Sequence, residues 1–363
     1  MQEATGATVP VAALGEFPLI ARLAARTPRP TPPAESSGLY LGIGDDAAVW
    51  VPTPHTATVV TADALIENVH FRQATTSAYD LGWKSLAVNL SDIAAMGAMP
   101  RYAVVTLGMP ATTSLAWFDE FQRGLAELAA AHDTLLVGGD LTGAPVIAIS
   151  VTVVGETLPL QDGVPPLLRR DTARPGDVVA VTGALGASAG GLRLLEGARA
   201  GGAEAMVTPD EESLLIAHRR PQPRIGPGRT LLTHGVRCGM DLSDGLLGDA
   251  RRIAEASGVR ITLEAARIPI APALLRRFPD DALRLALGGG EDYELLCAAA
   301  PRVIEAAAEA LAREHGLALT VVGWVETAEG GSEVQVVDAG GARLELRGGF
   351  AHFGEASIAS ASG

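Results

Sequence analysis

The stretch VVAVTGALGASAGGLRLLEGARA, residues 178–200, decides the fold class of this chain. It opens with a short run of apolar, mostly β-branched residues, which is typical of a strand. A glycine-rich turn follows, and the leucines after it recur at helical spacing. Units of this kind recur along the chain, and such an alternation of strands and helices predicts an α/β (α+β) fold.

The first half of the chain shows the same alternation. Apolar runs predict strands at residues 56–63, 101–110, 134–140 and 146–156. We expect Asp63 and Asp140 to end the first and third of these strands. Helical spacing of apolar residues predicts helices at residues 15–26, 78–100 and 114–132.

A turn-rich stretch at residues 157–177 separates the two halves. It contains four prolines and no periodic pattern of apolar residues. A length of 363 residues suits two domains of ordinary size. We place the boundary near residue 165, which gives an N-terminal domain at 1–165 and a C-terminal domain at 166–363. Residues 27–38, rich in proline and serine, predict a further loop.

The charge balance excludes two classes of partner. The formal net charge is −14, whereas nucleic acids and anionic membrane surfaces favour basic proteins. No segment approaches the ~18 continuous apolar residues of a membrane-spanning helix. The N-terminus lacks the basic and apolar regions of a secretory signal. We therefore expect a soluble cytoplasmic protein that binds neither nucleic acid nor membrane.

The two cysteines, Cys238 and Cys297, are far apart in the sequence and lie among apolar residues. No Cys-x-x-Cys pair is present, so the sequence predicts neither a zinc site nor a disulfide framework. We expect both cysteines to be buried as small hydrophobic residues.

Carboxylates recur beside glycine or small apolar residues. They are Asp45, Asp46, Asp63, Asp92, Asp140, Asp241, Asp244, Glu291 and Asp292. Asp92 follows Asn89 by three residues, so both lie on one face of the predicted helix. Carboxylates at strand ends suit hard divalent cations such as Mg²⁺, which also bind phosphate oxygens. The alternative is structural: Asp45 and Asp46 would form a solvated turn, and Asp241 or Ser243 would cap the helix that begins near Leu246.

Known nucleotide-binding motifs are missing. No Gly-x-x-x-x-Gly-Lys-Ser/Thr sequence occurs, which excludes a P-loop enzyme. Gly183, Gly186 and Gly190 do not have the spacing of a dinucleotide-binding turn. That turn could cradle a phosphate or could allow close strand–helix packing. No nucleophile and base stand close together in the sequence, which leaves open an arrangement formed by the fold.

Several motifs together carry a resemblance to a known family. They are GEFPLIARL (15–23), LGIGDDAA (41–48), VTADALIENVHF (60–71), KSLAVNLSDIAAMGAMP (84–100), VGGD (137–140), HRRPQPR (218–224), MDLSDGLLGD (240–249) and GGGEDYELL (288–296). With these motifs the chain resembles the thiamine-monophosphate kinase family of the aminoimidazole-ribonucleotide-synthetase-like ATP-binding superfamily. The resemblance implies a two-domain fold whose N-terminal halves pair into a homodimer, with ATP near the shared interface.

The resemblance also implies roles for particular residues. The implied ligands of several Mg²⁺ ions are Asp45, Asp46, Thr61, Ala62, Asp63, Asp92, Asp140, Asp241 and Asp244. Among these, Ala62 could contribute only its backbone. The implied ATP contacts are Gly139, Asp140, Arg170 and Ser243, and the implied substrate contacts are His70, Glu291 and Phe350.

From the residues alone, three of these roles have structural alternatives. His70 could be a packed structural residue that follows a strand, and Glu291 could cap a turn. Arg170 could lie in the polar linker rather than against a phosphate.

The implied reaction is ATP-dependent phosphorylation of thiamine monophosphate to thiamine diphosphate. Its acceptor is already a phosphate anion, so the reaction needs no general base, and Mg²⁺ ions would offset the repulsion between anions. Two alternatives remain. One is another enzyme of the superfamily that uses ATP on a purine-pathway amide, and the other is a non-catalytic nucleotide-binding regulator.

Overall fold

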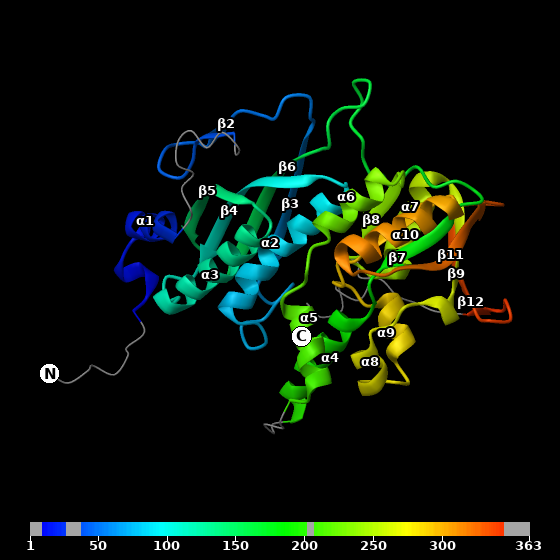
Figure 1. Ribbon diagram of the computed structural model, residues 1–363. Helices are drawn as coiled ribbons and strands as arrows, with labels where there is room; N and C mark the ends of the chain where they lie inside the picture. The colour runs from blue at the N-terminus through cyan, green and yellow to red at the C-terminus, as the bar shows by residue number, and fades with distance from the viewer. Residues whose placement is uncertain (1–8, 27–37, 202–206, 345–363) are drawn as a thin grey trace. The chain divides into compact units, whose positions relative to one another are not determined.

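The computed structural model describes residues 9–26, 38–201 and 207–344 (Figure 1). The chain divides into two compact units, and the main boundary between them in the sequence falls between residues 166 and 167. The first unit contains residues up to 93 together with 98–166, and the second contains 94–97 together with the residues from 167 onward. The turn-rich stretch 157–177 contains no helix and no extended strand, as predicted.

The first unit is built on a four-stranded sheet in the order β3-β6-β4-β5, with β4 and β5 parallel and the other neighbours antiparallel. A two-stranded sheet pairs β1 with β2. The elements in chain order are η1 (Val11–Ala13), α1 (Glu16–Arg26), β1 (Leu39–Leu41), β2 (Val49–Trp50), β3 (Thr58–Ile66), α2 (Ala78–Ala95), β4 (Met99–Met109), α3 (Leu115–Ala131), β5 (Leu135–Gly143) and β6 (Ala148–Glu156).

The two faces of this sheet differ. On one face, Val105 and Val151 are buried, and α2 and α3 lie on this side (Figure 1). On the other face, the row formed by Ala64, Ser150 and Thr106 stays partly or fully exposed. Side chains alternate between faces along a strand, so Val154 lies on this second face, where it is buried with Tyr102 in a smaller cluster against which Trp50 packs. The helix-covered face therefore carries one core of this unit, and part of the other face carries a second.

Helices α2 and α3 approach each other backbone to backbone. A Cβ atom added to Gly82 would lie 1.9 Å from the carbonyl oxygen of Phe121, and one added to Gly124 would lie 2.0 Å from that of Tyr79. Only glycine fits at either position. This contact fixes α2 against α3, and α2 carries the predicted residues Asn89 and Asp92.

The second unit is built on a seven-stranded sheet in the order β13-β12-β9-β11-β7-β10-β8. Its elements are β7 (Val178–Thr182), α4 (Ala187–Gly201), α5 (Pro209–Arg219), α6 (Ile225–Thr233), β8 (Cys238–Asp241), α7 (Leu246–Ser257), β9 (Val259–Glu264), η2 (Ala265–Arg267), α8 (Pro272–Arg277), α9 (Ala282–Gly288), β10 (Leu295–Ala299), α10 (Pro301–His315), β11 (Leu319–Thr327), β12 (Glu333–Val337) and β13 (Arg343–Leu344).

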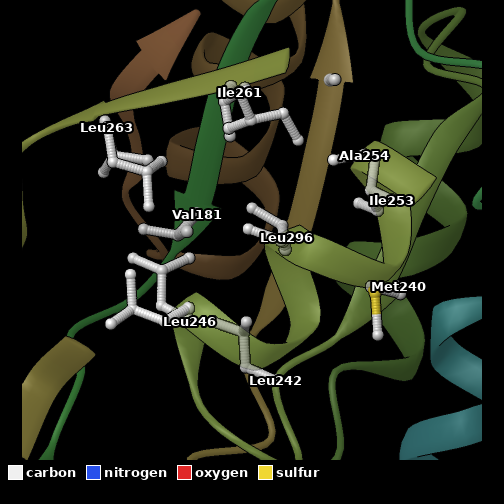
Figure 2. Close-up of a cluster of buried hydrophobic side chains, with 14 of the residues drawn as sticks. Val181, Met240, Leu242, Leu246, Ile253, Ala254, Ile261, Leu263 and Leu296 are labelled. Atoms are coloured by element: carbon white, nitrogen blue, oxygen red, sulfur yellow. The ribbon is translucent and has the colours of Figure 1, made fainter. Parts of the chain in front are cut away.

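The main core of the second unit lies between this sheet and α7. Val181, Ile261 and Leu296 from the strands pack with Leu246 and Ile253 from the helix (Figure 2). Both cysteines are buried and free, as predicted, and burial raises the pKa of Cys238 to about 11. Of the helices described, none is long and apolar enough to cross a membrane.

The predicted ends of two strands were wrong. Asp63 lies inside β3, which continues to Ile66, and Asp140 lies inside β5, which continues to Gly143. The reason is pairing: Ala64, Leu65 and Ile66 extend the ladder with β6, and Leu141, Thr142 and Gly143 extend the one with β4. Both carboxylates therefore project from a sheet face rather than from a strand end.

Candidate functional site

Two carboxylates lie close together in the first unit, Asp63 on β3 and Asp92 on α2. The hydroxyl of Thr61 donates to Oδ2 of Asp92 at 2.5 Å. The backbone N–H of Asp63 donates to Oδ1 of Asn89 at 3.0 Å. The helical spacing of Asn89 and Asp92 therefore places both side chains against the same strand, as the sequence predicted.

Asn89 is a fully buried link between strand and helix. Its Nδ2 donates to the carbonyl oxygen of Ser85 at 3.1 Å, while its Oδ1 holds the backbone of Asp63. Both ends of the amide are thus satisfied, as a buried polar group requires. The amide fixes the backbone from which the Asp63 carboxylate projects.

The electrostatics of this pair favour a cation. Asp63 keeps exposed surface, yet the surrounding chain removes enough water from its carboxylate to raise the pKa to about 6, and repulsion from Asp92 adds to the shift. A positive ion between the two carboxylates would relieve both causes. The pair therefore fits a hard divalent cation such as Mg²⁺, which binds one or two carboxylates and completes its shell with water and phosphate.

Asp140 lies at the opposite edge of the same sheet. Across the sheet Asp140 pairs with Thr106, Thr106 with Ser150, and Ser150 with Ala64, so these four side chains share one face. Asp63 precedes Ala64 on β3, so its side chain lies on the opposite face from that of Asp140. Three inter-strand spacings separate their strands, which is roughly 14 Å. The neighbouring Gly139 could not carry a side chain, because a Cβ would lie 2.0 Å from the carbonyl oxygen of Val105. One copy of this unit does not bring Asp63 and Asp140 together.

Asp45 and Asp46 lie in an exposed turn. Gly44 adopts a φ of 122°, which favours glycine, and the N–H of Asp46 donates to Oδ1 of Asp45 at 2.8 Å. This hydrogen bond helps two adjacent carboxylates to coexist at the surface.

His70 lies in the turn after β3. Its Nδ1 accepts the backbone N–H of Ile66 at 3.0 Å, which fixes the hydrogen of a neutral ring on Nε2. This contact gives the ring a structural role, and it orients Nε2 away from the strand that Nδ1 contacts.

In the second unit, two of the predicted motifs are joined by their backbones. The N–H of Glu291 donates to the carbonyl oxygen of Ser243 at 2.8 Å, and the N–H of Tyr293 donates to that of Leu242 at 2.9 Å. A Cβ at Gly290 would lie 2.6 Å from the Ser243 oxygen. The glycines of GGGEDYELL thus allow this loop to lie directly against the turn of MDLSDGLLGD.

Asp244 is held by residues that the sequence reasoning did not single out. Arg252 forms an ion pair with the Asp244 carboxylate. The backbone N–H of Asp244 donates to Oδ2 of Asp249 at 3.1 Å. Asp249 is fully buried, and burial followed by repulsion from Asp244 raises its pKa to about 7. The spacing of Asp244, Asp249 and Arg252 across the start of α7 was the available signal.

The capping alternative for Asp241 and Ser243 was wrong. The residue at the N-cap of α7 is Gly245, with a φ of 100° and no side-chain cap. A Cβ there would lie 2.8 Å from the carbonyl oxygen of Gly289, so the close loop packing requires glycine. Asp241 is 2% exposed at the end of β8.

The glycine-rich turn after β7 is occupied by a protein carboxylate. Asp292 accepts the N–H of Gly186 at 2.6 Å and that of Ser188 at 3.3 Å. Burial raises the pKa of Asp292 to about 7 although part of its surface is exposed. These two amides serve packing within the fold, which favours the packing alternative over a phosphate cradle at this turn.

The described residues contain no dense metal-binding cluster. Within residues 9–26, 38–201 and 207–344, no three His, Cys, Asp or Glu side chains are close enough together to hold a metal ion. An Mg²⁺ ion at the Asp63–Asp92 pair would use one or two carboxylates and complete its shell largely with water and phosphate oxygens.

The comparisons with known proteins agree along most of the chain. Residues 44–157 match the N-terminal domain of AIR synthase related proteins, and residues 174–336 match their C-terminal domain. The thiamine-monophosphate kinase of Bacillus subtilis is 34% identical over 346 residues, which is 94% of this chain and 100% of the relative. This chain belongs to the thiamine-monophosphate kinase family. The Escherichia coli K12 member is 39% identical over 317 residues, which is 86% of this chain and 90% of that protein.

Solved structures of the thiamine-monophosphate kinase family have the same two-domain fold. The Stenotrophomonas maltophilia enzyme is 41% identical with a TM-score of 0.77, over 89% of this chain and 96% of that one. The structure described as AaThiL complexed with AMPPCP and TMP is 31% identical with a TM-score of 0.71, over 97% and 100%. Hydrogenase maturation protein HypE, at 20% identity and a TM-score of 0.68, shares the fold.

Two predicted residues of the kinase site lie outside the matched domains. Arg170 is exposed between them, and its carbonyl oxygen accepts the Ser257 hydroxyl at 2.8 Å. Phe350 lies outside the described residues, as does almost all of the predicted loop 27–38.

Proposed function

We propose that this chain transfers the γ-phosphoryl group of ATP to the phosphate of thiamine monophosphate, giving thiamine diphosphate and ADP. The observation that carries the proposal is its similarity to curated thiamine-monophosphate kinases over most of both chains. The relative solved with AMPPCP and TMP supports a site for an ATP analogue and for the acceptor.

The reaction is direct in-line transfer. An oxygen of the acceptor phosphate forms a bond to the γ-phosphorus as the bond to the β-bridging oxygen breaks, and ADP leaves. The acceptor oxygen is largely deprotonated at pH 7, so no side chain has to remove a proton. The main barrier is repulsion between anions, and the chain acts by positioning the reactants and organising positive charge.

Mg²⁺ would supply that positive charge when bound. Asp63 and Asp92 fit it best, because their mutual repulsion is relieved by a cation. The full ligand set proposed for several ions is Asp45, Asp46, Thr61, Ala62, Asp63, Asp92, Asp140, Asp241 and Asp244. Asn89 orients Asp63, and Arg252 with Asp249 orients Asp244.

The remaining proposed contacts involve the two substrates. Gly139, Asp140, Arg170 and Ser243 would contact ATP. His70, Glu291 and Phe350 would contact thiamine monophosphate, with Glu291 supplying negative charge for its cationic heterocycle. The half-exposed Glu291 side chain, 29% accessible, supports a role in binding.

We also infer a homodimer formed by the first unit. The exposed part of its sheet face opposite α2 and α3 carries small residues, Ala62 and Ala64 on β3, beside Val60, which is 62% exposed. A second copy of this face fits such a surface, because small side chains allow two sheets to approach closely. A second copy would also bring further carboxylates to sites that one copy leaves incomplete. A cytoplasmic location agrees with two buried, free cysteines.

The test is to incubate the purified protein with ATP, Mg²⁺ and thiamine monophosphate and to separate the products by chromatography. We expect thiamine diphosphate and ADP in equal amounts, and no product after EDTA is added. ATP hydrolysis that requires a purine-pathway amide instead would favour the alternative enzyme of the superfamily. ATP binding with no turnover on either acceptor would favour a regulator.

A further inference from the structure

A chain of polar side chains leads from the start of α4 to the carboxylate of Glu291. Nδ1 of His218, at the end of α5, lies 3.3 Å from Oε2 of Glu291 and 3.0 Å from Oγ of Ser188. Ser188 in turn donates its backbone N–H to Asp292 at 3.3 Å. We propose that His218 and Ser188 are positioning residues that fix the Glu291 carboxylate for the cationic ring of the acceptor. This inference rests on the proposed function.

The backbone of Glu291 is held in an unfavourable conformation. Its φ is 66° and that of Tyr293 is 51°, both in the left-handed region that L-residues avoid at a cost of about 1 kcal/mol or more. The backbone hydrogen bonds from Glu291 to Ser243 and from Tyr293 to Leu242 maintain this conformation. Such strain is often found where a side chain must be aimed in one direction. The loop thereby fixes where the Glu291 side chain starts.

His218 then restricts where that side chain ends. A carboxylate only accepts hydrogen bonds, so the contact with Glu291 is favourable when Nδ1 of His218 carries its hydrogen. His218 is 7% exposed and Ser188 is 1% exposed, so both are held by packing. The Glu291 side chain keeps 29% of its surface accessible. It is thus contacted by His218 and keeps surface that a ligand can reach.

The position of His218 is itself fixed by close helix packing. A Cβ added to Gly191 on α4 would lie 2.2 Å from the carbonyl oxygen of Leu214 and 2.9 Å from Cβ of His218. Glycine at 191 therefore lets α5 lie against α4, and a larger residue would displace the imidazole.

This arrangement predicts an effect on acceptor binding rather than on chemistry. The heterocycle is remote from the phosphorus that is transferred. If the Glu291 carboxylate is no longer held in place, binding weakens equally in the ground state and in the transition state. Such a loss raises KM and leaves kcat nearly unchanged.

The experiment compares four variants in the complete protein. We expect His218→Ala to raise KM for thiamine monophosphate about 10-fold, with kcat and KM for ATP within about 2-fold of wild type. His218→Asn, which retains a donor close to the position of Nδ1, should recover most of the loss. Ser188→Ala should give a smaller increase in the same constant. His234→Ala is the matched control, because its Nδ1 contacts the carbonyl oxygen of Thr230 and the hydroxyl of Thr233, both within one helical turn of it in the sequence.

A double-mutant cycle separates positioning from a general structural effect. In a Glu291→Gln background, His218→Ala should change KM for thiamine monophosphate less than 2-fold further, because its effect acts through the carboxylate. Unchanged KM in a folded His218→Ala variant would overturn the inference, as would a parallel loss of kcat, both KM values and thermal stability. If His218→Ala does not fold, Ser188→Ala and His218→Asn decide by the same criteria. Failure of the wild type to form thiamine diphosphate would instead overturn the proposed function.

Discussion

The two units of this protein treat acidic groups differently. In the second unit, Glu294 is 5% exposed, and Arg224 binds both of its carboxylate oxygens while Thr182 donates a further hydrogen bond. In the first unit, the Thr61 hydroxyl donates to Asp92, the amide oxygen of Asn89 accepts the backbone N–H of Asp63, and the two carboxylates repel each other. The fold neutralises the first group with its own arginine. For the second pair, we propose that a cation from solution relieves the repulsion.

The largest expected effect tests the second half of this comparison. Asp92→Asn should lower kcat about 10³-fold at saturating Mg²⁺, because it removes a negative ligand from the proposed cation that would organise the phosphates. The melting temperature should stay the same or rise, because the repulsion with Asp63 is lost. Steady-state kinetics and calorimetry measure both quantities. Asp210→Asn, an exposed residue paired with Arg276, is the control and should keep full activity.

Turnover of the Asp92→Asn variant at the wild-type rate would show that this carboxylate holds no essential cation. A loss of activity accompanied by unfolding would assign Asp92 a structural role instead.

The next effect tests the neutralised group. Arg224→Ala leaves Glu294 buried without its cation and should destabilise the protein by about 3–5 kcal/mol. Urea denaturation measures this change. The matched variant Arg276→Ala removes an exposed arginine from Asp210 and should change the stability little. Equal stability of the two variants would remove the distinction between the buried and the exposed ion pair.

The smallest effect is a pH dependence of stability in the absence of metal. The pKa of Asp63 is about 6 in the folded protein against an ordinary value of 3.8. Its contribution to stability is therefore full below about pH 4 and is lost as the pH rises through about 6. We expect the melting temperature of the wild type to fall relative to that of Asp63→Asn over this range, and Mg²⁺ to reverse the difference at pH 7. Parallel curves for the two proteins would contradict the raised pKa.

The sequence predicted those features that depend on local spacing. Helix α2 and the shared face of Asn89 and Asp92 follow from a period of 3.6 residues, and the structure confirms both. The two-domain fold and the family followed from motifs that run in order along the chain.

Features that depend on strand register could not be predicted from the sequence. The alternation of strands and helices does not reveal that β3 pairs with β6, or that Asp140 lies at the far edge and on the other face from Asp63. The contact of His218 with Glu291 joins the end of α5 to the loop before β10, and the two residues are more than seventy positions apart. No local pattern encodes such contacts, because they arise only when the elements pack.

The most direct test of the central claim is a crystal structure of the protein with Mn²⁺ in place of Mg²⁺ and with a non-hydrolysable ATP analogue. The account predicts an anomalous difference peak at about 2.1 Å from a carboxylate oxygen of Asp63 and one of Asp92, bridging them to a phosphate oxygen. A bound nucleotide with its metal ions elsewhere, and with no peak at these two carboxylates, would contradict the account.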